Sequence, residues 1–521
     1  MKKIYLHIAL ALGLGSVVFT SCDDFLDTTP DDRTEIDTAD KARQILVAAY
    51  PTNSGNMAME WSSDNVIDNG DAYANPGRNM DQIYSWTQDT STGNDSPKSF
   101  WNACYSAIAN ANQALDALKG MEETSDVLAI KGEALLCRAF AHFLLSQNFC
   151  LAYNPETAAT DLGLPYAIKP ETEVAPQYSR GTMEELYGHI NKDIEEGLPL
   201  IKDAIYTVPK YHFNKAAAYA FATRFNLYYT NYDKAIQYAS EVLTDNPSAV
   251  LRDWASWLEL PKTFNAMWDG YIDADLPNNL MFLLPNSSQG RYISYGGYCE
   301  QYAHSKALSY IVGPRAPFIW EEYSRLIKAK YSGSNNQRIG YVCMPEKFEY
   351  TDKAAGIGYV HTVLIPFTTN KTLLERAEAY ALNNEIDNAV ADINAWMKSS
   401  LTTQAQYTKQ EILDYITPIA YTKYPATSLD DLTVKNELHP QGFTVNSGEQ
   451  EEIIQFILYL KRVETIHEGG RWMDIKRYGI EVSHMVEDDP ANPLLLPVGS
   501  PKRALQLPAD VITAGLQANP E

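Results

Sequence analysis

The sequence predicts a mainly α protein, in which helix pairs form a scaffold and long loop-rich segments with a few short strands pack on it. Three observations lead to this fold class. Apolar residues recur at three- and four-residue steps in eight segments of the 521-residue chain. Two pairs of these segments are joined by very short turns. The stretches between the predicted helices are long and rich in Asn, Asp, Gly, Pro and Tyr.

The predicted helices are recognised by their apolar stripes and by residues that favour helix ends. Thr38 is suited to cap the first helix, and Gly120 follows the second as a C-terminal cap would. Eight helices are enough for four antiparallel pairs. They cover residues 38–50, 98–119, 125–149, 181–198, 214–230 and 232–243, with two more inside 372–397.

Two of the predicted pairs resemble tetratricopeptide hairpins. In the pair 214–243, Pro247 lies twelve residues after Ala235, which is the spacing of that repeat. In the pair within 372–397, two asparagines mark the turn. This pattern favours a right-handed helical solenoid. An irregular α-helical bundle would show the same stripes, so both assemblies remain open at this stage.

Two long connections, residues 55–96 and 258–370, separate the predicted helices. Loops of this length in a compact protein are either functional or disordered. Their aromatic content argues against disorder, because disordered segments contain few aromatic residues. We expect short strands at residues 280–284 and 359–365.

The N-terminus has the pattern of a bacterial export signal that ends on a cysteine. Lys2 and Lys3 precede an apolar run over residues 8–19, which is too short to cross a hydrocarbon core of about 30 Å as a helix. Residues 1–21 are therefore predicted to be a cleaved signal peptide. The small residue before Cys22 predicts that this cysteine is lipidated. The alternative is an ordinary secretory signal that is cleaved near this point.

Charge and cysteine content argue against several classes of function. The chain has 42 Lys and Arg against 66 Asp and Glu, a formal net charge of −24, which disfavours nucleic-acid phosphates as partners. Apart from Cys22, the cysteines do not have the spacing of a zinc ligand set. Cys137 and Cys150 fall within a helical apolar pattern and are predicted to be core residues. We expect no metal and no cofactor.

A charged segment late in the chain invites comparison with catalytic sites. Glu464 and Glu468 are one helical turn apart in sequence, with several arginines nearby. We interpret this segment as a structural salt-bridge cluster, because Arg–carboxylate pairs lock chain segments together. The arginines concerned are Arg462, Arg471 and Arg477. The sequence therefore predicts no catalytic residue.

Two further motifs share some of their residues with known metal sites. His467 is followed by Glu468, as in a zinc-protease helix, but the second His of that motif is missing. The Asp- and Asn-rich run 64–81 lacks the ordered spacing of a calcium loop. Neither motif predicts a metal site.

The aromatic composition makes carbohydrate the first ligand to consider. The chain has 34 Tyr and nine Trp against 16 Phe, and such amphipathic rings can sit half exposed against a polar ligand. A sugar site needs an exposed ring face with hydrogen-bonding groups around it, and loops rather than helix stripes should supply both. Packing of the loops on the scaffold is the alternative role for each ring. The predicted ligand-binding residues are Tyr73, Arg78, Trp86, Tyr292, Tyr295, Tyr298 and Trp320.

Several segments, in this order, resemble the SusD/RagB family of outer-membrane nutrient-binding lipoproteins of Bacteroidetes. The most specific is residues 461–479, which is similar to a late Glu-Gly-x-Arg-Trp-x-Asp-x-x-Arg segment of that family. Residues 505–508 are a blunt version of the family's closing Pro-x-Pro element, which suggests a divergent member. The other matching segments are residues 22–27, 101–112, 132–140 and 376–380.

The resemblance implies a SusD-like fold, with four tetratricopeptide-like helix pairs as the scaffold. It divides the chain into a signal peptide at residues 1–21, an N-terminal region at 22–257, and a C-terminal SusD/RagB region at 258–521 that includes the helix pair 372–397. It implies a lipid-anchored protein of the cell outer membrane that faces the extracellular side. It also implies a SusC-like TonB-dependent transporter as the partner.

The implied function is the binding of an extracellular oligo- or polysaccharide and its delivery to that transporter, without catalysis. Capture of a peptide is the alternative within the same family. A glycan-degrading lipoprotein would need two carboxylates that converge in a cleft, about 5–10 Å apart. A purely structural subunit would bind no ligand.

Overall fold

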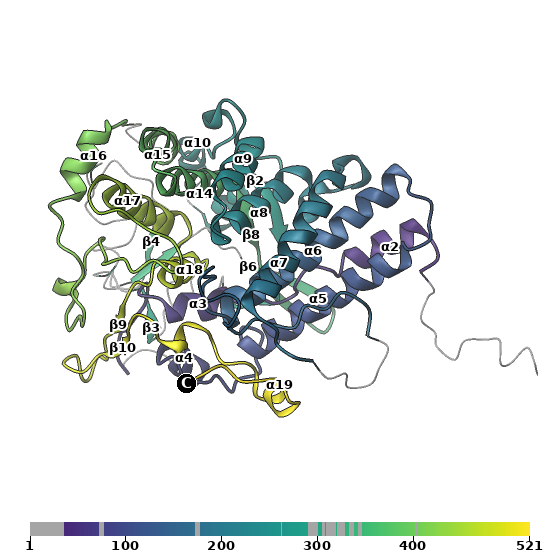
Figure 1. Cartoon of the computed structure of the whole chain (residues 1–521), viewed down its shortest axis with the longest axis horizontal. Coiled ribbons are helices and arrows are strands. Elements are labelled where there is room, and N and C mark those ends of the chain that lie inside the picture. The colour runs from purple at the N-terminus through teal and green to yellow at the C-terminus, as the bar shows by residue number, and fades with distance from the viewer. Residues whose placement is uncertain are drawn as a thin grey trace, which may run out of the picture. The chain divides into compact units, whose positions relative to one another are not determined.

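The computed structural model describes residues 36–71, 78–171, 178–261, 263–289, 301–304, 308, 319, 329–332, 338–341, 346–401 and 405–521 (Figure 1). Residues 38–521 form one compact unit. The predicted signal peptide and Cys22 lie outside the described residues.

The eight predicted helices are all present. Each packs against its neighbour along the chain or against the next pair: α5 lies beside α6, α6 beside α7, α8 beside α9, α9 beside α14, and α14 beside α15 (Figure 1). The mainly α fold class is therefore confirmed. The eight helices are α2 (Ala39–Leu46), α5 (Pro97–Ala117), α6 (Ser125–Phe149), α7 (Met183–Gly197), α8 (Lys215–Tyr228), α9 (Tyr232–Leu243), α14 (Thr369–Leu382) and α15 (Ile386–Ser400).

Local capping explains where these helices begin and end. The Thr38 hydroxyl accepts a hydrogen bond from the backbone N–H of Lys41, at 3.3 Å, and so caps α2 as predicted. Thr182 and Glu185 form a reciprocal capping box at the start of α7. Gly120 has a φ of 84° just beyond α5, a left-handed conformation that glycine adopts without strain. These side chains set the helix boundaries before any tertiary packing.

The scaffold core is apolar and closely packed. Phe140 on α6 is almost fully buried, and its ring lies 5.3 Å from that of Phe221 and 5.5 Å from that of Phe367, centroid to centroid. The first contact comes from α8 and the second from a strand. At the crossing of α6 and α7, a Cβ atom on Gly132 would lie 2.8 Å from the carbonyl oxygen of Gly197. Only a residue without a side chain allows this approach.

The two stretches expected to be loops contain short helices, so that part of the prediction was wrong. Residues 55–96 contain α3 (Asn56–Ser62) and α4 (Arg78–Tyr84), and residues 258–370 contain α11 (Phe264–Tyr271) just after α10 (Trp254–Leu258). In α3, every residue after the first is buried, so no apolar stripe marks it. A helix of seven residues is also too short for a period of 3.6 to be clear.

The C-terminal region adds helices that periodicity did not reveal. The longest is α17 (Glu449–Glu464), which packs on α14 and whose last thirteen residues are all buried, charged ones included. A helix buried on all sides shows no polar face. The others are α16 (Lys409–Ile416), α18 (Gly470–Arg477) and α19 (Ala509–Thr513). Short 3-10 turns occur in both regions of the chain, at Leu198–Leu200, Asp203–Ile205, Pro209–Tyr211, Pro247–Ala249, Leu429–Asp431 and Pro501–Arg503.

The strands of the described part of the chain form two-stranded antiparallel pairs. Both strand predictions were confirmed, although residues 359–365 contain the end of one strand and the start of the next. The pairs are β1 (Ile67–Asp68) with β3 (Tyr302–Ala303), β2 (Asn279–Leu283) with β8 (Leu364–Thr368), β4 (Ala329–Ser332) with β5 (Arg338–Tyr341), β6 (Glu346–Asp352) with β7 (Ile357–Thr362), and β9 (Val482–His484) with β10 (Leu494–Leu496).

Three cysteines are resolved as buried free thiols: Cys104, Cys137 and Cys150. The prediction that Cys137 and Cys150 are core residues is confirmed. Among the described residues, no helix combines the length and the apolar character needed to cross a membrane.

Candidate functional site

The two long connections predicted to carry the ligand site meet in the structure. Strand β1 comes from the first connection and β3 from the second, and Asp68 lies opposite Tyr302 in the antiparallel pair. One residue further along, the backbone N–H of Asn69 donates to the carbonyl oxygen of Gln301, at 2.7 Å. We call this contact between the connections the β1–β3 junction.

A column of four stacked rings lies beside the β1–β3 junction. The Tyr84 ring stacks on Tyr302 at 4.4 Å and on His484 at 4.0 Å, and Trp86 stacks on the other side of His484 at 4.2 Å. Burial lowers the pKa of His484 to about 4, so the imidazole is neutral at physiological pH. Tyr302, the outermost ring, is half-buried, while Tyr84 and Trp86 are buried. The column anchors the junction to the core.

Polar side chains at the junction form hydrogen bonds between its two segments. One carboxylate oxygen of Asp68 accepts from the Gln301 amide and from the backbone N–H of Gly70, both at 3.0 Å. The Asn69 amide donates to backbone carbonyls of the β3 segment, and Asp71 is exposed. The acidic run that was considered for calcium thus contributes hydrogen bonds between segments at Asp68.

Trp86 and Arg78 are the predicted ligand-binding residues of which the structure gives a position. Trp86 is 6% exposed, and its indole N–H donates to the carbonyl oxygen of Ser62 at 3.0 Å, so little of its ring is open to a ligand. Arg78 is the first residue of α4. The other predicted residues lie outside the described residues; they are Tyr73, Tyr292, Tyr295, Tyr298 and Trp320.

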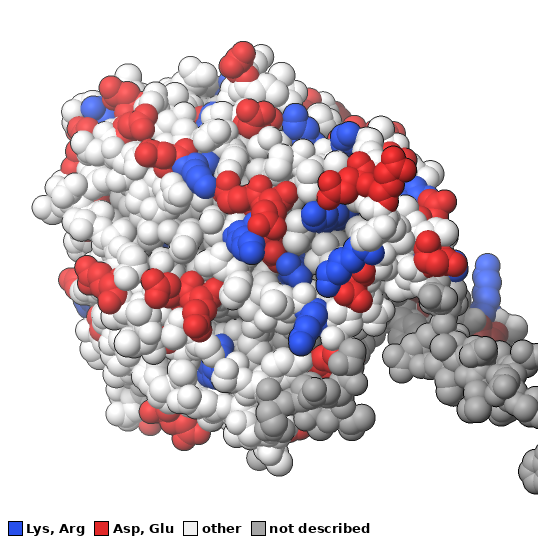
Figure 2. Space-filling view, turned by 45° about the vertical axis from the view of Figure 1, so that its right-hand side comes forward, with Lys and Arg blue, Asp and Glu red and all other residues white. Residues whose placement is uncertain are grey.

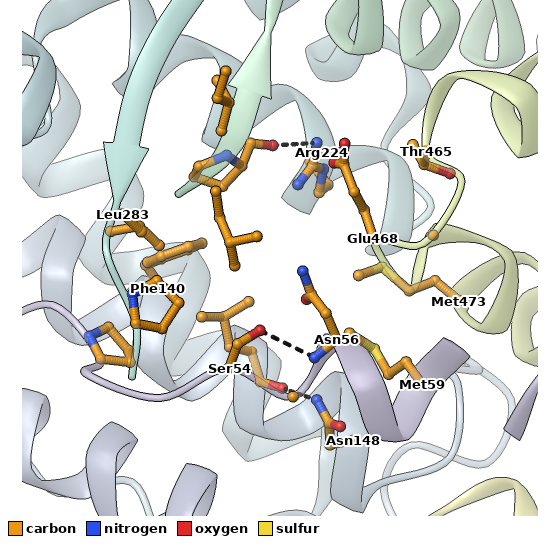
Figure 3. A pocket seen from close by; sticks show the side chains of 18 of the residues that line it. Ser54, Asn56, Met59, Phe140, Asn148, Arg224, Leu283, Thr465, Glu468 and Met473 are labelled. Carbon is orange, nitrogen blue, oxygen red and sulfur yellow. Dashed lines mark hydrogen bonds between the residues drawn. The ribbon is translucent and has the colours of Figure 1, made fainter. Parts of the chain in front are cut away.

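A cavity of about 90 Å³ opens between α3, α6, β2, β8 and the bend after α17 (Figure 3). One wall is apolar, with Leu283 and Phe140, and the opposite side carries Arg224 and Glu468. Two acceptors of its lining, Asn148 Oδ1 and Glu375 Oε2, have no hydrogen-bond partner within the described part of the chain. Ligand pockets for drug-sized molecules measure about 300–1,000 Å³. The cavity therefore suits water or a small polar molecule, and not an oligosaccharide.

The charged groups at the cavity are held in ion pairs. Arg224 Nε lies 2.6 Å from Glu375 Oε1, and the same guanidinium donates to the Pro366 carbonyl (Figure 3). Lys371 bonds to Glu468 and, at 2.6 Å, to the carbonyl oxygen of Ile365. The carboxylates of Glu375 and Glu468 are thus each paired with a cation, and such pairs hold chain segments together.

The late charged segment is a framework of buried ion pairs, as predicted, although the partners are not those that sequence proximity suggested. Arg471 makes a bidentate pair with Asp64, at 2.8 and 2.7 Å, and Arg462 approaches the same carboxylate at 3.1 Å. Burial alone would raise the pKa of Asp64, but the two guanidinium groups outweigh it and hold that pKa well below its usual range.

The two glutamates singled out in the sequence do not form a pair. Glu464 ends α17 and accepts from the Trp396 indole N–H at 3.0 Å, whereas Glu468 lies beyond the helix and pairs with Lys371. The expectation that they stand one helical turn apart was wrong, because α17 stops before Glu468. Their separate partners give both of them structural roles.

One exposed aromatic surface was missed by the sequence analysis. On the β6–β7 hairpin the rings of Phe348 and Tyr350 lie 4.7 Å apart, and Tyr350 and Tyr359 are 53% and 56% exposed. Gly358 stands opposite Tyr350 in the register, so nothing covers the ring from that strand. The alternation of Phe348 and Tyr350 was the available signal, but the stretch was interpreted as a loop. The hairpin is a second place where a sugar ring has an aromatic face to stack on.

Figure 2 shows how charged side chains are distributed over one face of the molecule. On the face shown in Figure 2, acidic side chains are scattered widely, and the basic ones lie among them without forming a continuous band. A polyanion needs a positively charged track. This face does not provide one.

Comparison with known proteins shows a similarity to SusD-like proteins. The SusD-like_3 family, described as "Starch-binding associating with outer membrane", matches residues 24–227. A SusD-like protein of Formosa agariphila is 22% identical over 516 residues, which are 91% of each chain. The chain is therefore similar to SusD-like proteins, and the range matched by the family model contains the helices α2 to α7.

Solved structures show the same fold over almost the whole chain. A SusD superfamily protein of Bacteroides thetaiotaomicron superposes with a TM-score of 0.62 at 16% identity and covers 94% of this chain and 100% of its own. A putative sugar binding protein of Bacteroides vulgatus gives a TM-score of 0.64 at 19% identity, with 94% and 99% covered. At these identities the likeness concerns the SusD-like fold.

Proposed function

We propose that this protein is a SusD/RagB-family lipoprotein of the outer-membrane surface that binds an extracellular glycan and delivers it to a SusC-like TonB-dependent transporter. The observation that carries the glycan proposal is the β1–β3 junction, at which the two Tyr-, Asn- and Asp-rich connections pair with each other. The family description, starch binding with outer-membrane association, supports the same conclusion. The protein would hold its ligand without breaking a bond.

Ligand contact would come from aromatic rings of the two connections that meet at this junction. Tyr73, Arg78, Tyr292, Tyr295, Tyr298 and Trp320 remain the proposed contacts. Stacking against pyranose rings, with hydrogen bonds from neighbouring amides and carboxylates, is the chemistry that these residue types provide. The buried column below the junction, which includes Trp86, would hold this surface in place. Among the three aromatic residues Tyr84, Trp86 and Tyr302 of the column, Tyr302 is half-buried and the other two are buried.

Calorimetric titration of the protein without residues 1–22 against a panel of polysaccharides, oligosaccharides and peptides tests the proposal. We expect heat with one glycan class, and its loss when Tyr292→Ala and Tyr295→Ala are combined. Tyr178→Ala with Tyr211→Ala is the matched control, because both side chains are exposed tyrosines outside the two connections. Heat with peptides alone, or release of reducing sugar by the purified protein, would contradict the proposal.

The lipid anchor has a separate test. We expect Cys22→Ala to abolish incorporation of a labelled fatty acid in the bacterial host and to release the protein from the outer-membrane fraction. Cys104→Ala is the control, because that thiol is buried in the fold. Equal labelling of the two variants would place the lipid elsewhere or exclude it.

A further inference from the structure

Three side chains with metal-ligating atoms converge in the interior: Glu60, His304 and His467. The Glu60 Oε1 atom lies 3.0 Å from His304 Nε2 and 3.7 Å from His467 Nδ1. One ligand atom from each residue falls within 4.8 Å of the other two. We call these residues the Glu60–His304–His467 cluster.

The cluster joins three segments that are distant in the sequence. Glu60 lies on α3, His304 directly follows β3, and His467 lies in the bend between α17 and α18. All three are buried, at 4%, 4% and 6% exposure. Buried charged or polar groups are normally paired with one another or bound to a metal.

The spacing of the ligand atoms fits a small tetrahedral ion. Zinc binds imidazole nitrogen and carboxylate oxygen at about 2.0–2.2 Å, which places neighbouring ligands of a tetrahedron about 3.3 Å apart. The distances from Glu60 Oε1 to His304 Nε2 and to His467 Nδ1, 3.0 and 3.7 Å, lie on either side of that value. Two imidazoles with one carboxylate are donors that suit zinc and other first-row transition ions, whereas calcium and magnesium prefer an all-oxygen shell.

The backbone at His467 is held in an unusual conformation. Its φ is +63°, in the left-handed region that non-glycine residues rarely adopt. The Gln289 amide donates to the His467 carbonyl oxygen at 2.5 Å and so fixes the peptide on that side. Backbone strain of this kind concentrates at functional sites, where surrounding contacts maintain it.

Neighbouring groups orient the carboxylate and moderate the local charge. Glu60 Oε1 accepts from the Asn65 amide at 2.9 Å, and the Asn65 carbonyl oxygen in turn accepts from Arg462 Nε at 2.7 Å. Such outer contacts fix the direction of a metal ligand. Arg462, the nearby cation, is paired with Asp64, which lessens its repulsion of an ion at the cluster.

We propose that Glu60, His304 and His467 form a binding site for one divalent first-row transition ion, with Zn²⁺ as the representative. The ion would cross-link α3, the end of β3 and the bend after α17. Since His304 is adjacent to β3, the ion would stabilise the β1–β3 junction from the interior. The site is structural, and its existence does not depend on the glycan proposal.

Titration of chelator-stripped full-length protein with ZnCl2, followed by elemental analysis of the dialysed complex, tests this site. We expect one equivalent of Zn²⁺ and a higher melting temperature. Glu60→Gln and His467→Asn should each weaken binding at least tenfold; asparagine is chosen at 467 because it tolerates a positive φ. His361→Asn is the control, because His361 pairs with a single exposed glutamate, Glu349. Unchanged stoichiometry and affinity in both cluster variants would overturn the proposal.

A second measurement needs no variant. Anomalous difference density at the zinc edge, from crystals soaked in ZnCl2, should show its main peak between the Glu60 carboxylate and the two imidazoles. No peak at the cluster after soaking at saturating ZnCl2, or a main peak at another position, would overturn the proposal even if the substituted proteins failed to fold.

Discussion

Two buried regions of the molecule, the core around Phe140 on α6 and the interface of α14 with the segment that runs from α17 to α18, are stabilised by different chemistry. Around Phe140 the scaffold buries aromatic and aliphatic side chains. Glu378 on α14 is fully buried and is surrounded by cationic side chains. Lys461 and Arg477 each lie 2.6 Å from its carboxylate. The hydrophobic effect that stabilises apolar packing is non-directional, whereas each buried ion pair depends on a specific partner of opposite charge.

The two regions are expected to differ in how strongly a single substitution destabilises the protein. Loss of one methylene from the apolar core costs about 0.5–1.5 kcal/mol. Loss of one charge beside α17 leaves its partners buried and uncompensated, which is the costlier change. The predictions that follow test this contrast, in order of decreasing effect.

The largest effect is expected for Glu378→Gln. The substitution keeps the shape of the side chain but leaves Lys461 and Arg477 without their shared carboxylate, so we expect the free energy of unfolding to fall by about 3–5 kcal/mol. Urea denaturation followed by circular dichroism measures it. Glu449→Gln, at an exposed pair with Lys409, is the matched control and should change stability far less, because solvent screens exposed ion pairs. Equal losses in the two variants would show that burial does not decide the effect.

The pH dependence of stability should follow the same carboxylate. Burial raises the pKa of Glu378, but Arg477 and Lys461 outweigh it and lower that pKa to about 2, below the usual 4.5. The stabilisation is therefore complete above about pH 4.5 and is lost as the pH falls towards 2, by up to about 3 kcal/mol.

The effect is measured as the difference between two unfolding curves over that pH range. Burial raises the pKa of the neighbouring Asp474, which acts in the opposite direction, so wild type must be compared with Glu378→Gln. The wild-type protein should lose more stability than the variant on acidification. Parallel curves for the two proteins would contradict the assignment.

At the α6–α7 crossing we expect Gly132→Ala to destabilise the scaffold by about 1–3 kcal/mol, since the added Cβ atom meets the Gly197 backbone at 2.8 Å. Gly188→Ala is the control on α7, because nothing lies within 4 Å of its Cβ position. That substitution should stabilise the helix by about 0.5–1 kcal/mol. Thermal denaturation of both variants gives the comparison, and a gain in stability at position 132 would exclude the close approach.

The smallest effect on stability is expected at the β6–β7 hairpin. Tyr350 is more than half exposed, so Tyr350→Ala should change the free energy of unfolding by less than about 0.5 kcal/mol. Lower glycan affinity in the calorimetric titration, at unchanged stability, would identify the hairpin as a second ligand platform. A large loss of stability would instead assign the ring to the fold.

Much of the fold could be predicted because local signals agree with tertiary packing in the repeat helices. Helix α6 runs from Ser125 to Phe149, the same range that periodicity predicted, and α9 matches its predicted range as well. Helices α3 and α17 were not predicted, because burial on all sides removes the contrast between apolar and polar faces.

The candidate site could be predicted only as two aromatic segments. Residues 67–68 pair with residues 302–303, which lie more than 230 positions later in the chain. No local sequence pattern encodes such a contact. For the same reason His467 offered no metal motif on its own chain segment. Its partners in the Glu60–His304–His467 cluster come from α3 and from the end of β3.

Sequence alone was sufficient to establish the helical repeats, their caps and the family resemblance, because helix periodicity and capping act within a few residues of each other. The partners of the buried charged side chains are determined by contacts between segments that are distant in the sequence. Asp64 is paired with Arg462 of α17 and Arg471 of α18, whose side chains are buried, and an ion pair in the interior requires a partner at a fixed position in space. That position depends on the assembled helices, and the chain order does not reveal it.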